Sequence, residues 1–455
     1  MTPLAIVLLA ALPFLVADKK PPAAPPAGRV ETIDALGLTL TLPEAFGALK
    51  PLDEKVDQVR AGWSGNVGAS ALRIVLFALP KEEFGFEEPE DVSEFIRDDF
   101  RERVDKGFAY SRTELVSGAF GCAPFAGLGF GPIHGKDGAT ITGDYFVLGG
   151  LLEGHGYSLE IVAEPSLDDA SEGIVLEFLR KGVAYKGPVR NPSWTDAEVK
   201  SRWAADAPPN LAKKMEKPVR TKHYIFLSNT DAAKQMGDEM EKAYLAIQKM
   251  YPFSEVAGRR LLPVFLFANQ TQYYDFYAKA FKTSVEEASN SKGVAYKDFY
   301  ATYYDAPQDP VHIHEMTHQV FANRLRLGGA GSWFQEGVAE YICTKAPERT
   351  DAANLVKKGR HTPLAQLIAI DSLLSTGAGD VKKGGEAGSL YLQAAMVIEF
   401  VRESKWSKDK FLEWVHAVGN CPDNNAEAIE RATKMVLGVD LAEFEAKYVE
   451  YCKKR

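Results

Sequence analysis

The sequence predicts an α+β protein in which a small antiparallel-sheet domain is followed by a mainly helical domain with a short mixed sheet. The first observation is length, because 455 residues exceed what one ordinary hydrophobic core accommodates. The second is apolar spacing: strand-like and helix-like segments alternate before Pro310, and helical spacing dominates after it. The third is a polar, proline-containing stretch at 188–218, which has the composition of an interdomain linker.

The N-terminal segment has the features of a secretion signal. Residues 4–17 form an almost unbroken apolar run, about the length of a signal-peptide core and too short to span a bilayer. Lys19, Lys20 and a stretch rich in Pro and Ala follow at once. We therefore predict a signal peptide at 1–17, a flexible leader at 18–29, and a secreted or periplasmic protein. The alternative is that the run is a buried strand or helix of the folded protein.

Residues 30–187 have the pattern of a small α+β domain. Residues 36–43 alternate between apolar and polar side chains and end at a proline, which is typical of a strand. Apolar side chains at helical spacing over 92–104 predict a helix. The other predicted elements are a β-rich segment at 71–79, strands near 139–149 and 156–163, and a closing helix near 171–183.

Residues 219–455 follow the predicted linker at 188–218 and form the predicted second domain. Asp231 is positioned to cap a long helix that runs to Tyr251. The other elements predicted before residue 310 are strands at 223–227, 261–267 and 299–304 and an aromatic helix at 273–280.

Composition excludes some classes of partner. The net charge is -9 and no block of Lys or Arg is present, so we expect no nucleic-acid partner, because phosphate binding needs a concentrated basic face. No run beyond residue 17 reaches the length of a membrane span.

Of the four cysteines, Cys421 and Cys452 flank two predicted helices and either pair or remain free buried thiols.

The most informative segment is 311–319, which reads VHIHEMTHQ and contains the pattern H-E-x-x-H. Residues four apart lie on the same face of an α-helix, so His314 and His318 can direct two imidazoles at one ion. Imidazole nitrogen is a good zinc donor. Glu315 lies one residue further round the helix, where a base can take a proton from water at the metal. The alternative is a helix with two ordinary histidines.

A second segment, 331–341, reads GSWFQEGVAEY and strengthens the metal hypothesis. The intervening residues are enough for the chain to leave one helix, turn at the glycine-rich residues 328–331, and enter a second helix beside the first. An acid near the start of that helix can supply a third ligand. Two histidines and one acid leave a coordination position open for water, which is the arrangement of a catalytic zinc site.

These two segments resemble the motifs of the gluzincins and, within them, of bacterial peptidase-MA-like domains. Residues 314–319 look like the family's HExxHq and 333–341 look like its WxxEGxAEY, with weaker likeness over roughly 220–420. The resemblance implies a zinc metallopeptidase domain with Glu336 as the third zinc ligand. It also implies that Glu340 hydrogen-bonds a ligand histidine, with Glu340 as the competing candidate for the third ligand.

Two known zinc-peptidase motifs are absent from the sequence, and their absence narrows the class of peptidase that it resembles. The third-histidine pattern of metzincins would need Gly and His where this chain has Phe321 and Arg324. The aminopeptidase signature GxMEN is absent before the H-E-x-x-H segment, so an exo-acting aminopeptidase is unsupported.

The resemblance also indicates a donor for the oxyanion that forms when water attacks a peptide carbonyl. Peptidase-MA-like domains often carry Y-x-Q at the place of residues 391–393, which makes Tyr391 the candidate; a tyrosine that packs on the core is the alternative. His361 is the alternate donor. His312 lies on the opposite side of the helix from His314, and we expect a helix-start or surface residue there. The strand at 299–304 either pairs with an extended substrate or packs within its own sheet.

The first domain resembles PsbP-like domains in layout. The opening strand and turn at 36–46 read LGLTLTLPEAF, a helix follows two strands, and a helix closes the unit. The resemblance implies a central antiparallel sheet with flanking helices. It also implies a binding or spacer role for this domain rather than a catalytic one.

The predicted function is that of a secreted bacterial zinc metallopeptidase that hydrolyses a peptide or protein substrate. Zn2+ is held by His314, His318 and Glu336, Glu315 is the general base, and Tyr391 stabilises the oxyanion. The rival is a catalytically weak zinc-containing binding protein of the periplasm or cell surface. Glu315 favours catalysis, because a purely structural zinc site does not need it. A helical domain without metal is the third possibility.

Overall fold

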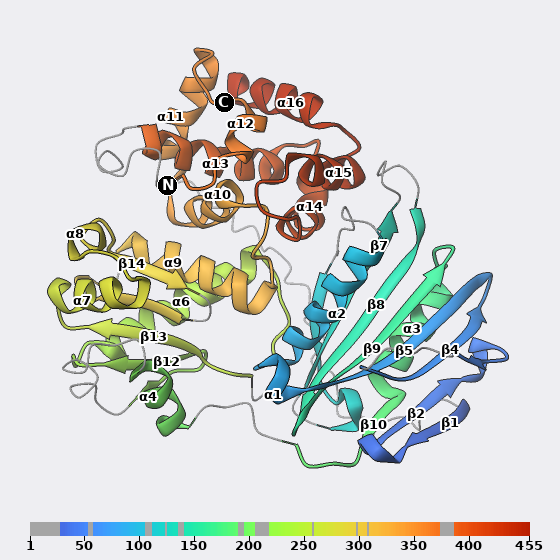
Figure 1. The fold of residues 1–455 in the computed structure, drawn as a ribbon. Helices are drawn as coiled ribbons and strands as arrows, with labels where there is room; N and C mark the ends of the chain where they lie inside the picture. Colours follow the sequence, from blue (N-terminus) through green and yellow to red (C-terminus); the bar gives the residue numbers. More distant parts are fainter. Residues whose placement is uncertain are drawn as a thin grey trace, which may run out of the picture.

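The computed structural model describes residues 28–52, 58–104, 112–122, 125–134, 141–189, 195–204, 218–256, 259–296, 299–306, 309–373 and 386–455. The predicted signal peptide and most of the predicted leader and linker lie outside these residues. Figure 1 shows a large sheet with its helices, a smaller sheet with its helices, and a group of C-terminal helices above the smaller sheet. The predicted fold class is confirmed: an antiparallel-sheet domain precedes a helical region with a short mixed sheet.

The first domain (28–189) is built on two antiparallel sheets. Within the described residues, the larger sheet has the strand order β3-β4-β5-β9-β8-β7-β6 and the smaller has the order β1-β2-β10. The strands of the larger sheet are β3 (Lys50–Pro51), β4 (Val59–Val67), β5 (Ser70–Pro80), β6 (Arg112–Val116), β7 (Ala126–His134), β8 (Ile141–Leu152) and β9 (His155–Glu164). Those of the smaller sheet are β1 (Gly28–Ile33), β2 (Leu38–Pro43) and β10 (Val183–Tyr185).

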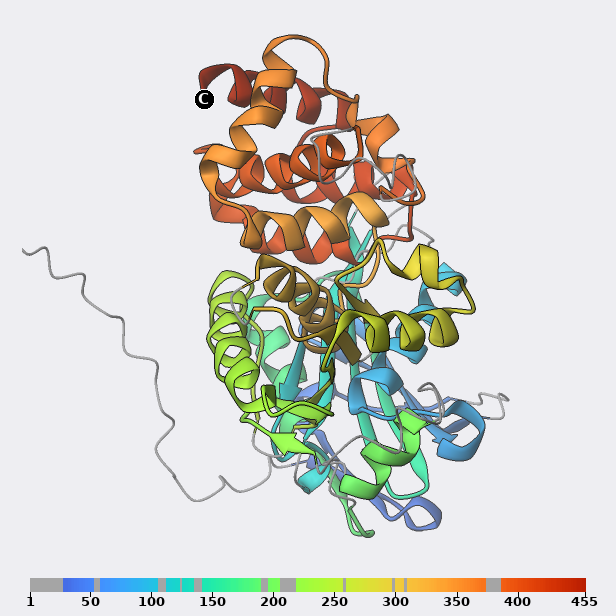
Figure 2. The same cartoon turned by 90° about the vertical axis from the view of Figure 1, so that its left-hand side faces the viewer.

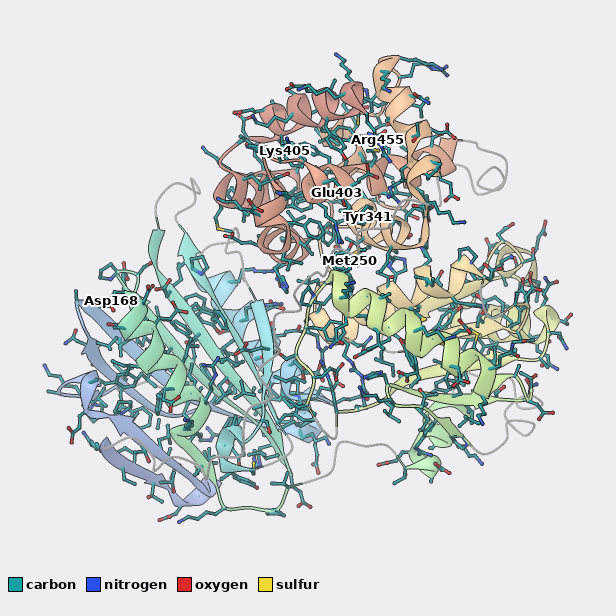
Figure 3. All side chains as sticks on the ribbon, turned by 180° about the vertical axis from the view of Figure 1, so that it is seen from behind. Asp168, Met250, Tyr341, Glu403, Lys405 and Arg455 are labelled. Atoms are coloured by element: carbon teal, nitrogen blue, oxygen red, sulfur yellow. The ribbon has the colours of Figure 1, made fainter. Side chains whose placement is uncertain are left out.

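Two helices cover opposite faces of the larger sheet. Helix α2 (Pro89–Val104) follows the short helix α1 (Lys81–Phe84) and buries its apolar stripe against one face. Helix α3 (Asp169–Lys181) packs against the other face and the smaller sheet. Asp168 caps α3 by accepting a hydrogen bond from the Ser171 backbone N–H at 2.7 Å, and it lies at the outer end of the domain (Figure 3).

Strands β4 and β7 were not predicted, because glycines interrupt their sequence pattern, whereas β8 was predicted near 139–149 although it also contains glycines. A Cβ added to Gly127 would lie 3.1 Å from the Cα of Glu90, and one added to Gly149 would lie 2.5 Å from the carbonyl oxygen of Pro89. The glycines are therefore the positions where α2 approaches the sheet most closely, and they do not mark turns. Strand β1 also begins at Gly28, inside the segment that we predicted as leader.

The second domain (218–455) begins with a mixed sheet of order β11-β12-β13-β15-β14. Its inner strands β12, β13 and β15 are parallel, and β11 and β14 pair antiparallel at the edges. The strands are β11 (Val219–Arg220), β12 (Tyr224–Ser228), β13 (Leu262–Phe267), β14 (Gly293–Tyr296) and β15 (Phe299–Tyr303). The strand predicted at 299–304 is β15, which lies inside the sheet between β13 and β14. One edge of the sheet is the four-residue β14, which is too short to show a period.

Helices cover both faces of this sheet. Helices α6 (Ala233–Met250) and α9 (Pro310–Val320) pack on one face, and α7 (Gln270–Phe281), followed by α8 (Val285–Ala288), packs on the other. Helix α4 (Asp196–Ala204) lies inside the predicted linker, and its buried Trp203 contacts Phe265 and Phe299 on the α7 face. The predicted cap of α6 was wrong, because the N-cap residue is Ala232 and makes no side-chain cap.

The remaining helices form a bundle that lies over α9 (Figure 2). They are α10 (Ser332–Cys343), α11 (Ala346–Lys357), α12 (Leu364–Ile368), α13 (Glu386–Glu403), α14 (Phe411–Gly419), α15 (Ala426–Leu437) and α16 (Leu441–Lys454). Hydrogen bonds as well as apolar packing hold these helices together. One example is the 3.0 Å hydrogen bond from the Tyr341 hydroxyl on α10 to Glu403 on α13 (Figure 3). Cys421 and Cys452 are buried free thiols and do not pair. Within the described residues, no helix combines the length and apolarity needed to cross a bilayer.

The two domains meet at a buried group of charges, which we call the interdomain ion cluster. Its acids precede or begin α2, and its arginines lie just before β13 and just after α9. Arg259 contacts Glu90 at 2.7 Å, and both side chains are nearly fully buried. The other pairs are Arg260 with Glu87 and Glu88 (2.7 and 3.1 Å) and Arg326 with Glu88 and Asp91 (2.7 and 3.0 Å).

Candidate metal centre

Helix α9 carries the H-E-x-x-H residues, and its start is well defined by the sequence. Asp309 is the N-cap residue, and its carboxylate accepts a hydrogen bond from the Val311 backbone N–H at 3.0 Å. Pro310 occupies the first helical position, where its missing N–H has no cost. An aspartate cap contributes about 1 kcal/mol to helix stability. The cap therefore sets the helical register from which the histidines project.

His314 and His318 bring one ring nitrogen each to the same point. The two Nε2 atoms lie 3.2 Å apart, and the rings are inclined at 80°. This is the arrangement that the four-residue spacing predicted.

Glu336 reaches the same point from α10. Its Oε2 atom lies 3.0 Å from His314 Nε2 and 3.4 Å from His318 Nε2. The three side chains are only 14–20% exposed, so they are largely shielded from solvent. The structure thus brings together the three residues that the sequence nominated as ligands.

The chain between α9 and α10 explains how this acid arrives. A π-helical turn (Phe321–Leu325) ends α9, and the left-handed Arg326 (φ 56°) turns the chain. A Cβ at Gly329 would lie 2.2 Å from the carbonyl oxygen of Cys421, so only glycine fits where the loop passes the end of α14. Gly337 lies against α13 in the same way, since its Cβ would be 3.0 Å from the Ala394 carbonyl oxygen. These close approaches fix α10 beside α9.

The donor atoms have the separations that a zinc ion requires. Zinc holds nitrogen and oxygen ligands at about 2.0–2.1 Å, so two ligands of a tetrahedral ion lie about 3.3 Å apart. The three observed separations are 3.0, 3.2 and 3.4 Å. Two imidazoles and one carboxylate are also the donor set of a catalytic rather than a structural zinc site. The residues present therefore fit Zn2+.

The electrostatics of the three residues are mutually dependent. Burial alone would raise the pKa of Glu336, but the charges of His318 and His314 and their hydrogen bonds hold it well below its usual range. Burial alone would lower the pKa of His314, but its contacts with Cys343, Glu336 and Glu340 raise it well above its usual value. Both pKa shifts arise from the same short contacts between the carboxylate and the imidazoles.

Glu315 lies beside the three ligands and outside their group. Its Oε2 atom accepts a hydrogen bond of 2.8 Å from the backbone N–H of Ala295 on the edge strand β14. Burial raises the pKa of Glu315, which makes it a stronger base than an exposed carboxylate. The contact with Ala295 was not foreseen, because nothing in the sequence marks β14 as the neighbour of α9.

Tyr391 lies on α13, on the bundle side of the centre. Its ring is 6.3 Å from the ring of His314, measured between centroids. Burial and the charge of Glu336 raise the pKa of Tyr391, so its hydroxyl stays protonated and can donate a hydrogen bond. His361, the alternate donor, instead contacts Glu445 and Tyr448 of α16.

A second group of potential ligands adjoins the first. Glu340 Oε2 lies 3.3 Å from His314 Nδ1, the ring nitrogen that faces away from Glu336. Cys343 Sγ lies 3.9 Å from the same nitrogen and 3.5 Å from Glu340. The thiol was not nominated from the sequence, although Glu336, Glu340 and Cys343 recur at helical spacing on one face of α10. Glu340 is where the resemblance placed an acid that orients a ligand histidine.

His312 takes no part in this centre. Its Nδ1 atom lies 2.7 Å from the Tyr300 hydroxyl, and its Nε2 atom lies 2.9 Å from the carbonyl oxygen of Ala306. The side chain is buried, so the expectation of a surface residue was wrong, whereas its place in the first turn of α9 was right. A histidine with both nitrogens occupied by the fold is structural.

Comparison with solved structures gives remote neighbours. Among solved structures, the chain is similar to a mutant of a two-domain M1 zinc metallopeptidase bound to L-arginine, at 11% identity and a TM-score of 0.31, over 86% of this chain and 90% of that one. It is also similar to the M1 zinc metallopeptidase of Deinococcus radiodurans, at 10% identity and a TM-score of 0.29, over 85% and 89%. No family model and no curated protein matches. The function proposed below therefore rests on the residues of this chain.

Proposed function

We propose that this protein is a zinc-dependent peptidase that hydrolyses peptide bonds in a peptide or protein substrate. One observation carries the proposal: two imidazole nitrogens and the Glu336 carboxylate converge at separations of 3.0–3.4 Å, with the partly buried Glu315 beside them. Zinc, when bound, supplies Lewis acidity for a carbonyl group and for water.

The chain's own groups supply the proton transfers. Glu315 is held at Oε2 by the Ala295 N–H, which leaves Oε1 to accept a proton from the attacking water and to pass it to the leaving amine. The protonated hydroxyl of Tyr391 donates a hydrogen bond to the oxyanion that develops on the substrate carbonyl. Glu340 holds the outer nitrogen of His314 and so fixes which ring nitrogen faces the ion.

The test is Glu315→Gln, which keeps the shape of the side chain and removes the base. We expect zinc to stay at one ion per chain and turnover of a peptide library to fall by about 10²- to 10⁴-fold. Glu427→Gln, at an exposed site on α15, is the matched control and should cleave like the wild type, and a chelator should abolish cleavage by both active forms. A Glu315→Gln protein as fast as the wild type would refute the mechanism. A wild type that holds zinc but cleaves nothing would favour the rival, a zinc-containing binding protein.

We also propose export to the periplasm or the exterior, supported by the apolar run at 4–17 and the residues after it. The resemblance of the sequence at 36–46 to PsbP-like domains supports a binding or spacer role for the first domain. N-terminal sequencing of the protein recovered from its host would detect cleavage after the predicted signal peptide.

A further inference from the structure

A cavity lies between the two domains, away from the metal centre. It has a volume of about 290 Å³ and is partly open to solvent. One wall is the second half of α2, with Glu94, Arg97 and Arg101. The other wall is formed by Gly328 and its neighbours and by the residues that follow α14. The size suits a small molecule or ion rather than a peptide.

The charge on the α2 wall is incompletely neutralised. Arg97 and Arg101 are four residues apart on one helix face, a spacing at which like charges repel. Arg97 pairs with Asp98 at 2.7 Å, whereas the described residues give Arg101 no carboxylate partner. Arg101 Nη2 donates to the backbone carbonyl of Asn420, at 2.8 Å. Burial, followed by the charge of Arg97, lowers the pKa of Arg101.

Two buried guanidinium donors at the cavity have no hydrogen-bond partner among the residues that the structure describes. They are the Nε atoms of Arg101 and Arg326. Buried polar atoms are satisfied in the great majority of cases, and an unsatisfied N–H on a cation is among the most costly exceptions. A group with several acceptor oxygens, set between the two side chains, would satisfy both.

The one acid on the wall does not cancel this charge at neutral pH. Burial raises the pKa of Glu94 to about 7, against the opposing charge of Arg326, so part of the molecules carry a neutral carboxyl there. A protonated carboxyl can itself donate a hydrogen bond to an oxyanion.

The opposite wall is the loop that leads into α10. Arg326 and Ala330 both have positive φ (56° and 70°), a conformation that costs energy in residues with a side chain. Six residues after Ala330, the same chain carries Glu336 to the metal centre. Whatever occupies the cavity therefore contacts the segment that sets the position of α10.

We propose that this cavity is a binding site for a small oxyanion, phosphate or carboxylate, held by Arg101 and Arg326 between the two domains. The bound anion neutralises the α2 wall and stabilises the strained loop before α10. This site does not depend on peptidase activity.

The test is isothermal titration of the full chain with inorganic phosphate and, in a second arm, with succinate, at constant ionic strength against sodium chloride. We expect saturable binding of at least one anion at one site per chain; the arm that saturates identifies the source as phosphate or carboxylate. Arg101→Gln should weaken that binding by about 10- to 100-fold, the value of a hydrogen bond to a charged group. Arg360→Gln, an exposed arginine outside the cavity, is the matched control and should leave it unchanged.

A second variant tests the opposite wall of the cavity. A Cβ at Gly328 meets no atom within 4 Å, so Gly328→Leu adds bulk to the cavity wall without touching the Arg101 contacts. This variant should weaken binding of the anion and leave the fold and the zinc content of the protein unchanged. The proposal is overturned if neither anion saturates in the millimolar range, if chloride gives the same heat, or if Arg101→Gln and Gly328→Leu bind as tightly as the Arg360→Gln control.

Discussion

The metal centre and the interdomain ion cluster are both buried groups of charged side chains, but they are completed in different ways. In the cluster, the chain supplies both signs: Glu88 is met by Arg260 and Arg326, and Glu90 by Arg259. At the metal centre, Glu336 is met by imidazole nitrogens, which offer lone pairs as readily as protons.

The difference separates charges that hold the fold from charges that perform chemistry. Burial would raise the pKa of Glu88, but four arginines outweigh it and lower the pKa to about 2, so this carboxylate stays ionised and inert. Burial raises the pKa of Glu315, and the charges of His314 and His318 offset this rise only in part. Buried acids with unbalanced surroundings are the ones poised to exchange protons.

The largest effect should come from breaking the cluster. Glu88→Gln leaves Arg260 and Arg326 partly unpaired in a buried site, which costs about 3–5 kcal/mol in the free energy of unfolding. Zinc content should not change. Urea denaturation measures the loss, and Glu239→Gln, in an exposed pair with Lys242, should cost less than about 1 kcal/mol. Equal losses in the two variants would mean that the cluster contributes no more than a surface pair.

Removing the hydroxyl at the metal centre should damage activity and spare the fold. We expect Tyr391→Phe to lower kcat by about 10²- to 10³-fold, as when an oxyanion donor is removed, with zinc retained. Peptide-cleavage kinetics measure it. Tyr451→Phe, which loses a bond to Glu399 on the far side of the bundle, is the control and should keep its kcat. A rise in KM alone would assign Tyr391 to substrate binding.

Glutamates 336 and 340 can be ranked by zinc affinity. Glu340→Gln should lower the affinity for zinc by about 10- to 100-fold, which is the usual effect of removing a residue that orients a ligand histidine. Glu336→Gln should weaken it further, and Cys343→Ser less than either. Competition with a calibrated chelator measures all three. If Glu340→Gln loses more zinc than Glu336→Gln, the second group of ligands is the true site.

The smallest effect concerns acid stability. The pKa of Glu88 falls from its ordinary 4.5 to about 2 on folding, so its contribution is complete above 4.5 and is lost as the pH falls from 4.5 towards 2. Between pH 5 and pH 3.5 this one group should cost about 1 kcal/mol. Thermal unfolding against pH measures it, with Glu88→Gln as the reference. An identical pH profile for both proteins would contradict the assignment.

Local patterns predicted those parts of the molecule that depend on a single helix. The four-residue spacing of His314 and His318 placed two nitrogens 3.2 Å apart, because an α-helix repeats its faces at that interval. The hydrogen bond from the Ala295 N–H to Glu315 joins residues 20 apart in the sequence. It could not be predicted, because Ala295 lies on a short edge strand with no recognisable period. The glycines of β7 were misleading for the same reason: Gly127 lies where α2 packs over the sheet, and the sequence of β7 does not show that contact.

The sequence by itself determined the donor types, the helix that carries two of them, and the division into a sheet domain and a helical domain. The tertiary structure decided that Glu336 meets both histidines and that Glu340 takes the outer nitrogen of His314. It also decided that Glu88 and Arg326, 238 residues apart, join the domains. The physical reason is range: backbone hydrogen bonds fix neighbours a turn apart, whereas convergence between elements depends on close packing, as where Gly329 passes Cys421.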